Sequence, residues 1–334
     1  MKKEEKKIDS VEQLEFLFPD YIDESIIKTP PYRIARVEMT SGRHYFVRKT
    51  DEDSETGEYI LPSITTIIDK TSPLSREIIN KMIEFGKEKW DAYLKERQDY
   101  GTNMHILISE FIRSKKLSLP LKEDDIVSIS SRNKGFNVHI YEKFKSDLIS
   151  DLLAFAQFVV DYEVTPMAVE IPLASTYYKF AGTLDFPCFM TINEKGYHGE
   201  LYKTGPNKGA MKETYKDVRV IGLVDFKSGR HGFYRGNEIQ LFMAELLFIE
   251  NFPEISLSGY KIKSFNWSPK EWRVRPTYNL TEQTGKTTIA NVKSRVELFL
   301  DEYDSNFKSK RYFEGDLILG EAPEEIIKTK FSYE

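Results

Sequence analysis

The stretch Val224-Asp225-Phe226-Lys227-Ser228-Gly229 decides how the middle of this 334-residue chain folds. Because β-branched and aromatic residues dominate 218–227, the sequence predicts a strand that ends at the Ser-Gly pair. Side chains on a strand alternate between its faces, so Asp225 and Lys227 share one face and the apolar residues share the other. A carboxylate beside an amine at a strand end is costly unless it is used, although an exposed ion pair has the same pattern.

Earlier in the chain, carboxylates recur inside apolar strand patterns. In Ala181-Gly182-Thr183-Leu184-Asp185-Phe186, Thr183 and Asp185 share a strand face. Glu170 stands within Val169-Glu170-Ile171-Pro172-Leu173, another predicted strand. Taken alone, each carboxylate also fits the solvated face of a sheet.

Two further polar residues stand on predicted helices. Tyr100-Gly101-Thr102-Asn103-Met104-His105 places His105 in the first turns of a helix over 101–113, and Gln240 opens an apolar helix over 237–250. A single histidine on a helix is more often structural than a ligand. Alone, Gln240 indicates nothing.

The order of elements predicts an α/β protein with a mixed sheet and helices packed on it. A parallel doubly wound sheet does not fit, because strands and helices do not alternate regularly. We expect a charged turn at 50–57, a loop-rich stretch at 114–137 and either an extended hairpin tip or an insertion at 193–216. The other predicted strands are 43–49, 168–174, 180–190, 255–267 and 272–279, and the other predicted helices are 75–94, 140–162, 281–301 and one that begins at 64–68.

Composition excludes several classes of protein. No apolar run approaches the ~20 residues that a membrane helix needs, so we expect no membrane association. One cysteine, Cys188, excludes an internal disulfide and a four-cysteine iron–sulfur cluster, and it favours a reducing, cytoplasmic compartment. The net charge of −5 does not indicate a nucleic-acid binder, but a locally basic cleft can still collect phosphates.

Taken together and in order, the motifs resemble the PD-(D/E)XK nuclease superfamily. The pattern G-T-x-x-H, E-x-P-L, A-G-T-x-D, V-D-F-K-S-G and a helix-opening Gln is similar to its RecB-like branch, which includes phage exonucleases and mitochondrial genome maintenance exonucleases. Leu61-Pro62-Ser63-Ile64-Thr65 strengthens the likeness, because such exonucleases often carry a P-S-V-T-like segment there. The resemblance covers roughly residues 58–265. One departure is Ala244, which stands where the family's Q-x-x-x-Y motif has tyrosine; Tyr234 is a candidate replacement.

The resemblance implies a restriction-endonuclease-like core with an N-terminal helical arch, and it implies one or two Mg²⁺ or Mn²⁺ ions. Hard oxygen ligands suit these ions, and an imidazole favours Mn²⁺. The metal ligands that it implies are His105, Asp185, Asp225 and the backbone carbonyl of Phe226. The catalytic set is Asp185 and Asp225, with Lys227 to orient water, Glu170 to hold a metal-bound water or second cation, and Gln240 to steady Lys227 and the scissile phosphate.

The stretch from Tyr202 to Arg235 is the most basic of the chain, with eight Lys or Arg against three Asp or Glu. We therefore expect phosphate contacts there, and aromatic residues beside basic ones can stack on unpaired bases. The same side chains also fit a solvated hairpin or sheet packing. The predicted substrate-binding residues are Ser63, Thr65, Tyr178, Lys179, Ser228, Arg230, Tyr234 and Arg235.

The predicted organisation is an extension over 1–60, a nuclease domain over 61–305 and a tail over 306–334. Within the domain we expect a helical part over 61–165, a catalytic sheet core over 166–280 and a closing helix. The expected function is metal-dependent hydrolysis of DNA, as an exonuclease on single-stranded or end-bearing DNA in phage or bacterial replication, recombination or repair. Two alternatives stay open: a non-catalytic nucleic-acid-binding member of the same fold, and an RNA-processing nuclease.

Overall fold

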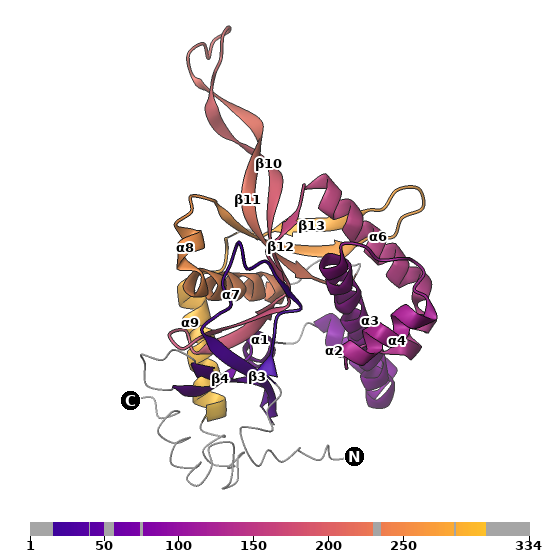
Figure 1. The fold of residues 1–334 in the computed structure, drawn as a ribbon. Helices are drawn as coiled ribbons and strands as arrows, with labels where there is room; N and C mark the ends of the chain where they lie inside the picture. The colour runs from indigo at the N-terminus through magenta and orange to yellow at the C-terminus, as the bar shows by residue number, and fades with distance from the viewer. Residues whose placement is uncertain are drawn as a thin grey trace.

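A mixed five-stranded sheet forms the centre of the molecule (Figure 1). The computed structural model describes residues 16–39, 41–49, 57–73, 76–229, 235–283 and 285–304. The strand order is β13-β12-β11-β10-β6, and within this sheet β11 and β12 pair in parallel while the other neighbours pair antiparallel. The expected α/β class with a mixed sheet is confirmed. The strands are β6 (Thr165–Pro166), β10 (Phe186–Leu201), β11 (Met211–Phe226), β12 (Ile262–Pro269) and β13 (Tyr278–Glu282).

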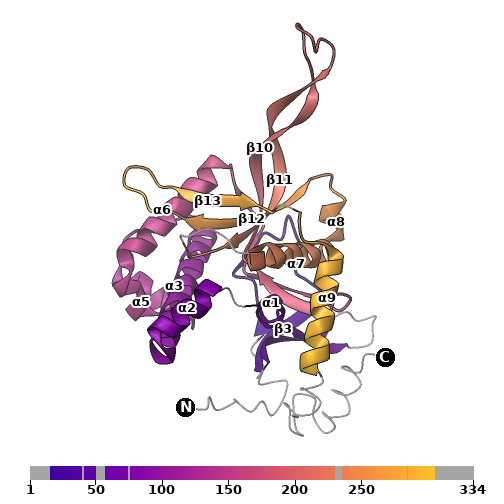
Figure 2. The ribbon, with the colours of Figure 1, turned by 180° about the vertical axis from the view of Figure 1, so that it is seen from behind.

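Two groups of helices cover opposite faces of this sheet (Figures 1 and 2). Side chains of β11 alternate between two hydrophobic cores, one on each face of the sheet. Val224 and Phe226 pack in the core that contains α3 (Lys87–Ser114), α5 (Val138–Lys143) and α6 (Lys145–Asp161). Leu223 packs with the second group of helices. That group consists of α1 (Ile64–Thr71), α7 (Arg235–Asn251) and α9 (Ile289–Phe299).

Three smaller sheets lie beside the central one. The N-terminal sheet has the order β1-β3-β4-β5, with β1 at Phe16–Leu17, β3 at Tyr32–Met39, β4 at Gly42–Lys49 and β5 at Glu58–Pro62. Two short pairs complete the set: β2 (Tyr21–Ile22) with β7 (Ala168–Val169), and β8 (Ile171–Ser175) with β9 (Phe180–Leu184).

The N-terminal sheet packs against the rest of the fold. Ser63 forms a parallel bridge with Ala181 of β9. The Tyr32 hydroxyl accepts a hydrogen bond from the backbone N of Ala174, at 2.9 Å, and donates one to Asn251 of α7. Segments far apart in the sequence are thereby held together.

The hairpin of β10 and β11 extends well beyond the sheet (Figure 1). Its strands remain paired out to Leu201 and Met211, with a register shift between Tyr197 and Leu201. The predicted extended tip at 193–216 is confirmed.

Several predicted helix boundaries in the first half are wrong. The helix expected at 75–94 ends at Phe85 as α2 (Arg76–Phe85), because Gly86 takes a positive φ of 70°. The next helix, α3, then runs unbroken through 94–101. The stretch expected to be loop-rich holds α4 (Glu123–Arg132), and the long helix expected at 140–162 is interrupted at Phe144 between α5 and α6.

The second half needs similar corrections. The strand expected from 255 begins at Ile262, after the short helix α8 (Pro253–Ser256). The strand expected at 272–279 begins only at Tyr278 and ends at Glu282 as β13. The closing helix begins at Ile289, where Thr288 caps it, and continues as a π-helical turn over Leu300–Asp304. The predicted tail at 306–334 falls outside the described residues, as does the predicted charged turn at 50–57 except for Gly57. Within the described ranges, the helices are all too short or too polar to cross a lipid bilayer.

Candidate metal centre and the surrounding pocket

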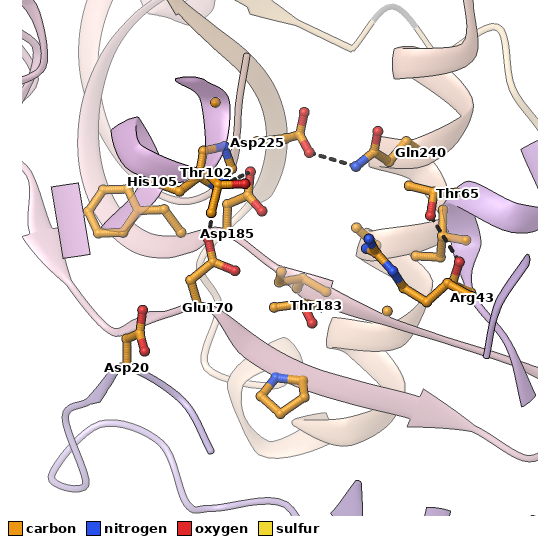
Figure 3. A pocket seen from close by; sticks show the side chains of 18 of the residues that line it. Asp20, Arg43, Thr65, Thr102, His105, Glu170, Thr183, Asp185, Asp225 and Gln240 are labelled. Atoms are coloured by element: carbon orange, nitrogen blue, oxygen red, sulfur yellow. Dashed lines mark hydrogen bonds and ion pairs between the residues drawn. The ribbon is translucent and has the colours of Figure 1, made fainter. Parts of the chain in front are cut away.

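A pocket of about 900 Å³ opens at the carboxyl end of β11, where Asp225 stands. Its walls come from the N-terminal sheet, α1, α3, β8, β9 and α7. The carboxylates of Glu170, Asp185 and Asp225 and the imidazole of His105 all line it (Figure 3). The predicted site residues therefore come together from four separate parts of the chain.

His105, Glu170 and Asp185 form a group that could hold a metal ion. Each offers one ligand atom, and the three atoms lie within 4.8 Å of one another. Nδ1 of His105 is 2.8 Å from a Glu170 carboxylate oxygen and 3.9 Å from a carboxylate oxygen of Asp185. One nitrogen and two oxygen donors suit a divalent cation such as Mn²⁺ or Mg²⁺.

Glu170 and Asp185 enter this group because both interrupt strands. The predicted strand at 168–174 is broken at Glu170, which adopts a left-handed φ of 51°, and the strand predicted at 180–190 is broken at Asp185. The two breaks lie side by side, since the backbone N of Glu170 donates to the carbonyl of Asp185 at 2.9 Å. A left-handed backbone at a residue other than glycine costs of order 1 kcal/mol, and such strain gathers at functional sites.

α3 brings His105 to the carboxylates from the middle of a 28-residue helix, not from the first turns as predicted. α3 also lies close to the end of β11 at Gly101, where a Cβ would lie 3.1 Å from Oγ of Ser228. The His105 ring also meets the Phe226 ring edge to face, with centroids 5.5 Å apart. Gly101, which was predicted to begin a helix, therefore lies inside α3 at a contact with another element.

Asp225, Lys227 and Gln240 form a second group beside the first. Lys227 Nζ lies 2.6 Å from a carboxylate oxygen of Asp225 and donates to the Gln240 side-chain oxygen at 2.9 Å. The amide nitrogen of Gln240 donates to the other oxygen of Asp225 at 2.8 Å. The predicted contact of Gln240 with Lys227 is present. Asp225 does not belong to the three-residue group: its Oδ1 accepts from Gln240, and its buried Oδ2 lies beside the Lys227 ammonium.

Asp185 connects the two groups through the backbone. Its Oδ2 accepts a hydrogen bond from the backbone N of Phe226 at 2.7 Å, which ties the start of β10 to the end of β11. Phe226, predicted as a ligand through its carbonyl, thus contacts Asp185 through its N–H, and its side chain is buried in the core.

Burial and mutual charge shift the protonation of the site. Burial raises the pKa of Asp185 to about 6, against the opposing effect of His105. Burial likewise raises the pKa of Asp225 to about 6, although Lys227 opposes it. Burial by itself lowers the pKa of His105, but Asp185 and Glu170 outweigh burial and raise it to about 9. The imidazole is therefore charged at neutral pH, and an incoming cation must displace its proton.

The other predicted substrate-binding residues divide into three groups. Ser63, Thr65 and Ser228 line the pocket. Tyr178 and Lys179 lie on the turn between β8 and β9 and are not among the lining residues. Arg230 and Tyr234 lie outside the described residues, and Arg235 begins α7 with its side chain outside them.

Sequence reasoning missed the contribution of the N-terminal sheet. Arg36 from β3 and Arg43 and Tyr45 from β4 line the pocket, and Thr183 of β9 lies 3.3 Å from the Tyr45 hydroxyl. The alternation of β4 was visible in the sequence, but nothing local indicated where the sheet would pack. Ala244, the departure from the tyrosine motif, also lines the pocket.

Comparison with known proteins adds no family assignment: no family model matches the chain, and no curated protein matches it.

Proposed function

We propose that this protein is a divalent-metal-dependent nuclease of the PD-(D/E)XK type, with a restriction-endonuclease-like core, that hydrolyses phosphodiester bonds in DNA. The observation that carries the proposal is that two groups of side chains lie next to each other, and every member except Lys227 lines the pocket. A histidine and two carboxylates suited to a cation stand beside a lysine held by an aspartate and a glutamine. These residues are the ones that the ordered sequence motifs contain.

His105, Glu170 and Asp185 would hold the cation, and Asp225 is adjacent on β11. When bound, a Mg²⁺ or Mn²⁺ ion acidifies water and offsets the negative charge of the phosphate. Burial opposes the charged form of Lys227, but Asp225 and Asp185 outweigh it and raise its pKa. Lys227 therefore remains an ammonium, which orients water and stabilises charge that develops on the phosphate.

Gln240 holds the side chains of Asp225 and Lys227 in fixed positions through its two hydrogen bonds. Thr65 lines the same pocket, where its hydroxyl can contact a phosphate oxygen. The buried Ser63 hydroxyl caps α1 and bonds to Thr65 and Thr66, so it positions this end of the helix. We propose an exonuclease that acts on single-stranded or end-bearing DNA in phage or bacterial replication, recombination or repair.

The test compares hydrolysis of end-labelled single strands, linear duplex, circular DNA and RNA with Mg²⁺, Mn²⁺ or EDTA. Asp185→Asn removes a charged oxygen donor from the proposed cation site, so we expect the cleavage rate to fall at least about a hundredfold. Asp217→Asn is the matched control, because Asp217 is exposed on β11 near the hairpin arm.

Cleavage that EDTA leaves unchanged would contradict the metal mechanism. Cleavage of circular DNA would contradict the exonuclease, and a preference for RNA would make the protein an RNA-processing nuclease instead.

A further inference from the structure

The pocket has walls of opposite charge. Glu170, Asp185 and Asp225 gather at one end, and Arg43 lies across from them, beyond Thr183 and Gln240 (Figure 3). The backbone of a nucleic acid carries a negative charge at every phosphate. Such a backbone fits this pocket if metal cations neutralise its charge at the carboxylate end and arginine guanidinium groups neutralise it at the opposite wall.

The basic wall is one face of the β3–β4 pair. Arg36 stands opposite Tyr45 in the strand register, and Glu38 stands opposite Arg43. Arg36 and Arg43 both pair with Glu38, at 3.0 and 3.6 Å, and all three side chains are more than a third exposed. Exposed ion pairs of this kind contribute little, so a phosphate can replace Glu38 as the partner at small cost.

Phe18 stands at the rim of the same pocket. It is 75% exposed, yet it is one of the pocket's lining residues. The chain beside it is anchored, because the backbone N of Asp20 donates to Val169 at 3.0 Å and the carbonyl of Asp20 accepts from Arg113 at 3.0 Å. A large apolar ring is thus held in water at the entrance by a fixed segment.

We propose that the N-terminal sheet binds an unpaired stretch of nucleic acid, in which Phe18 stacks on a base and Arg36 contacts a phosphate. This inference rests on the proposed nuclease function and names its substrate class: a strand whose bases are free at the entrance. An aromatic ring stacks on any exposed base face, whatever the sequence. In a duplex those faces are covered by neighbouring bases, and exposing one costs a few kcal/mol.

The experiment measures binding of a fluorescent single-stranded oligonucleotide and of the matching duplex, with Ca²⁺ as the cation. We expect Phe18→Ala to weaken single-strand binding about tenfold and duplex binding much less, and Phe18→Trp to restore it. Leu257→Ala is the control, since Leu257 is 86% exposed and does not line the pocket.

The salt dependence tests Arg36 separately. Each lost phosphate contact lowers the slope of log K against log salt by about 0.7 for a single strand, so Arg36→Gln is expected to show that decrease. Arg33→Gln, on the same strand but not among the lining residues, is expected to keep the wild-type slope.

Two results separate this inference from the proposed function. If the wild-type protein cuts DNA and Phe18→Ala binds single strands as tightly as wild type, the inference is overturned and the nuclease stands. If the wild-type protein neither binds nor cuts any nucleic acid, both are overturned.

Discussion

Gln240 holds two side chains of the candidate site at once, through hydrogen bonds of 2.9 Å to Lys227 and 2.8 Å to Asp225. Asp225 is buried and Lys227 carries a positive charge. Because Gln240 bonds to both side chains, its amide group fixes their positions relative to each other. At the scale of the residue, the candidate site combines direct donors such as His105 with positioning groups such as Gln240.

We expect Gln240→Ala to lower kcat of the proposed hydrolysis about tenfold to a hundredfold, with KM little changed, because the lysine would lose its fixed orientation. Initial rates over a range of DNA concentrations measure both constants. Gln157→Ala is the control, since Gln157 makes a similar bond, to Asp161, on the exposed side of α6. An unchanged kcat would show that Gln240 does not position the lysine.

At the scale of the element, α3 joins the site to the helical half of the protein. It carries His105 toward the pocket and, near its end, the buried carboxylate of Glu110. Glu110 accepts a hydrogen bond from Arg113 of the same helix at 3.1 Å. It also accepts hydrogen bonds from Arg132 at 2.9 Å and from Asn133 at 3.2 Å, and these two attach the end of α4 to α3.

Replacing Glu110 by alanine is expected to reduce the free energy of unfolding by about 2 kcal/mol, because charge-assisted hydrogen bonds to a buried group are lost. The loss is smaller than for a fully buried ion pair, since both arginines are partly exposed. Urea unfolding measures it, with Glu123→Ala on the exposed face of α4 as the control. Equal stability of the two variants would contradict this account of the α3–α4 contact.

At the scale of the whole molecule, the N-terminal sheet completes the pocket and is held by buried contacts. His44 of β4 is 5% exposed, its Nδ1 lies 3.0 Å from the carbonyl of Gly42, and its ring lies near that of Phe299 in α9. Burial lowers the pKa of His44 from 6.5 to about 4, although the Gly42 carbonyl and Glu38 oppose it.

This shift makes stability depend on pH. Between pH 6.5 and 4, His44 is protonated in the unfolded chain but still neutral in the folded protein. The contribution of His44 to the free energy of unfolding is therefore complete above pH 6.5 and is lost as the pH falls from 6.5 through 4. The loss amounts to about 3 kcal/mol. Unfolding measured from pH 7 to 4 should show a shallower decline for His44→Asn than for wild type, and parallel curves would contradict the assignment.

The helix boundaries show where sequence patterns mislead. The predicted helices at 75–94 and 101–113 left a gap between them, but α3 runs through this gap, and Gly101 lies within the helix close to Ser228. Conversely, the breaks at Glu170 and Asp185 lie inside patterns that indicate unbroken strands. Packing between distant elements outweighs local preference at these positions.

The sequence alone determined what depends on neighbours in the chain. Asp225 and Lys227 share a strand face because side chains alternate, and the β10–β11 hairpin follows from two strand patterns joined by a turn-rich stretch. Only the tertiary structure decided that His105 meets Glu170, 65 residues away, and that Arg36 and Phe18 face the same pocket. Such contacts depend on how whole elements pack, and the buried surfaces that direct this packing are not a local property of any motif.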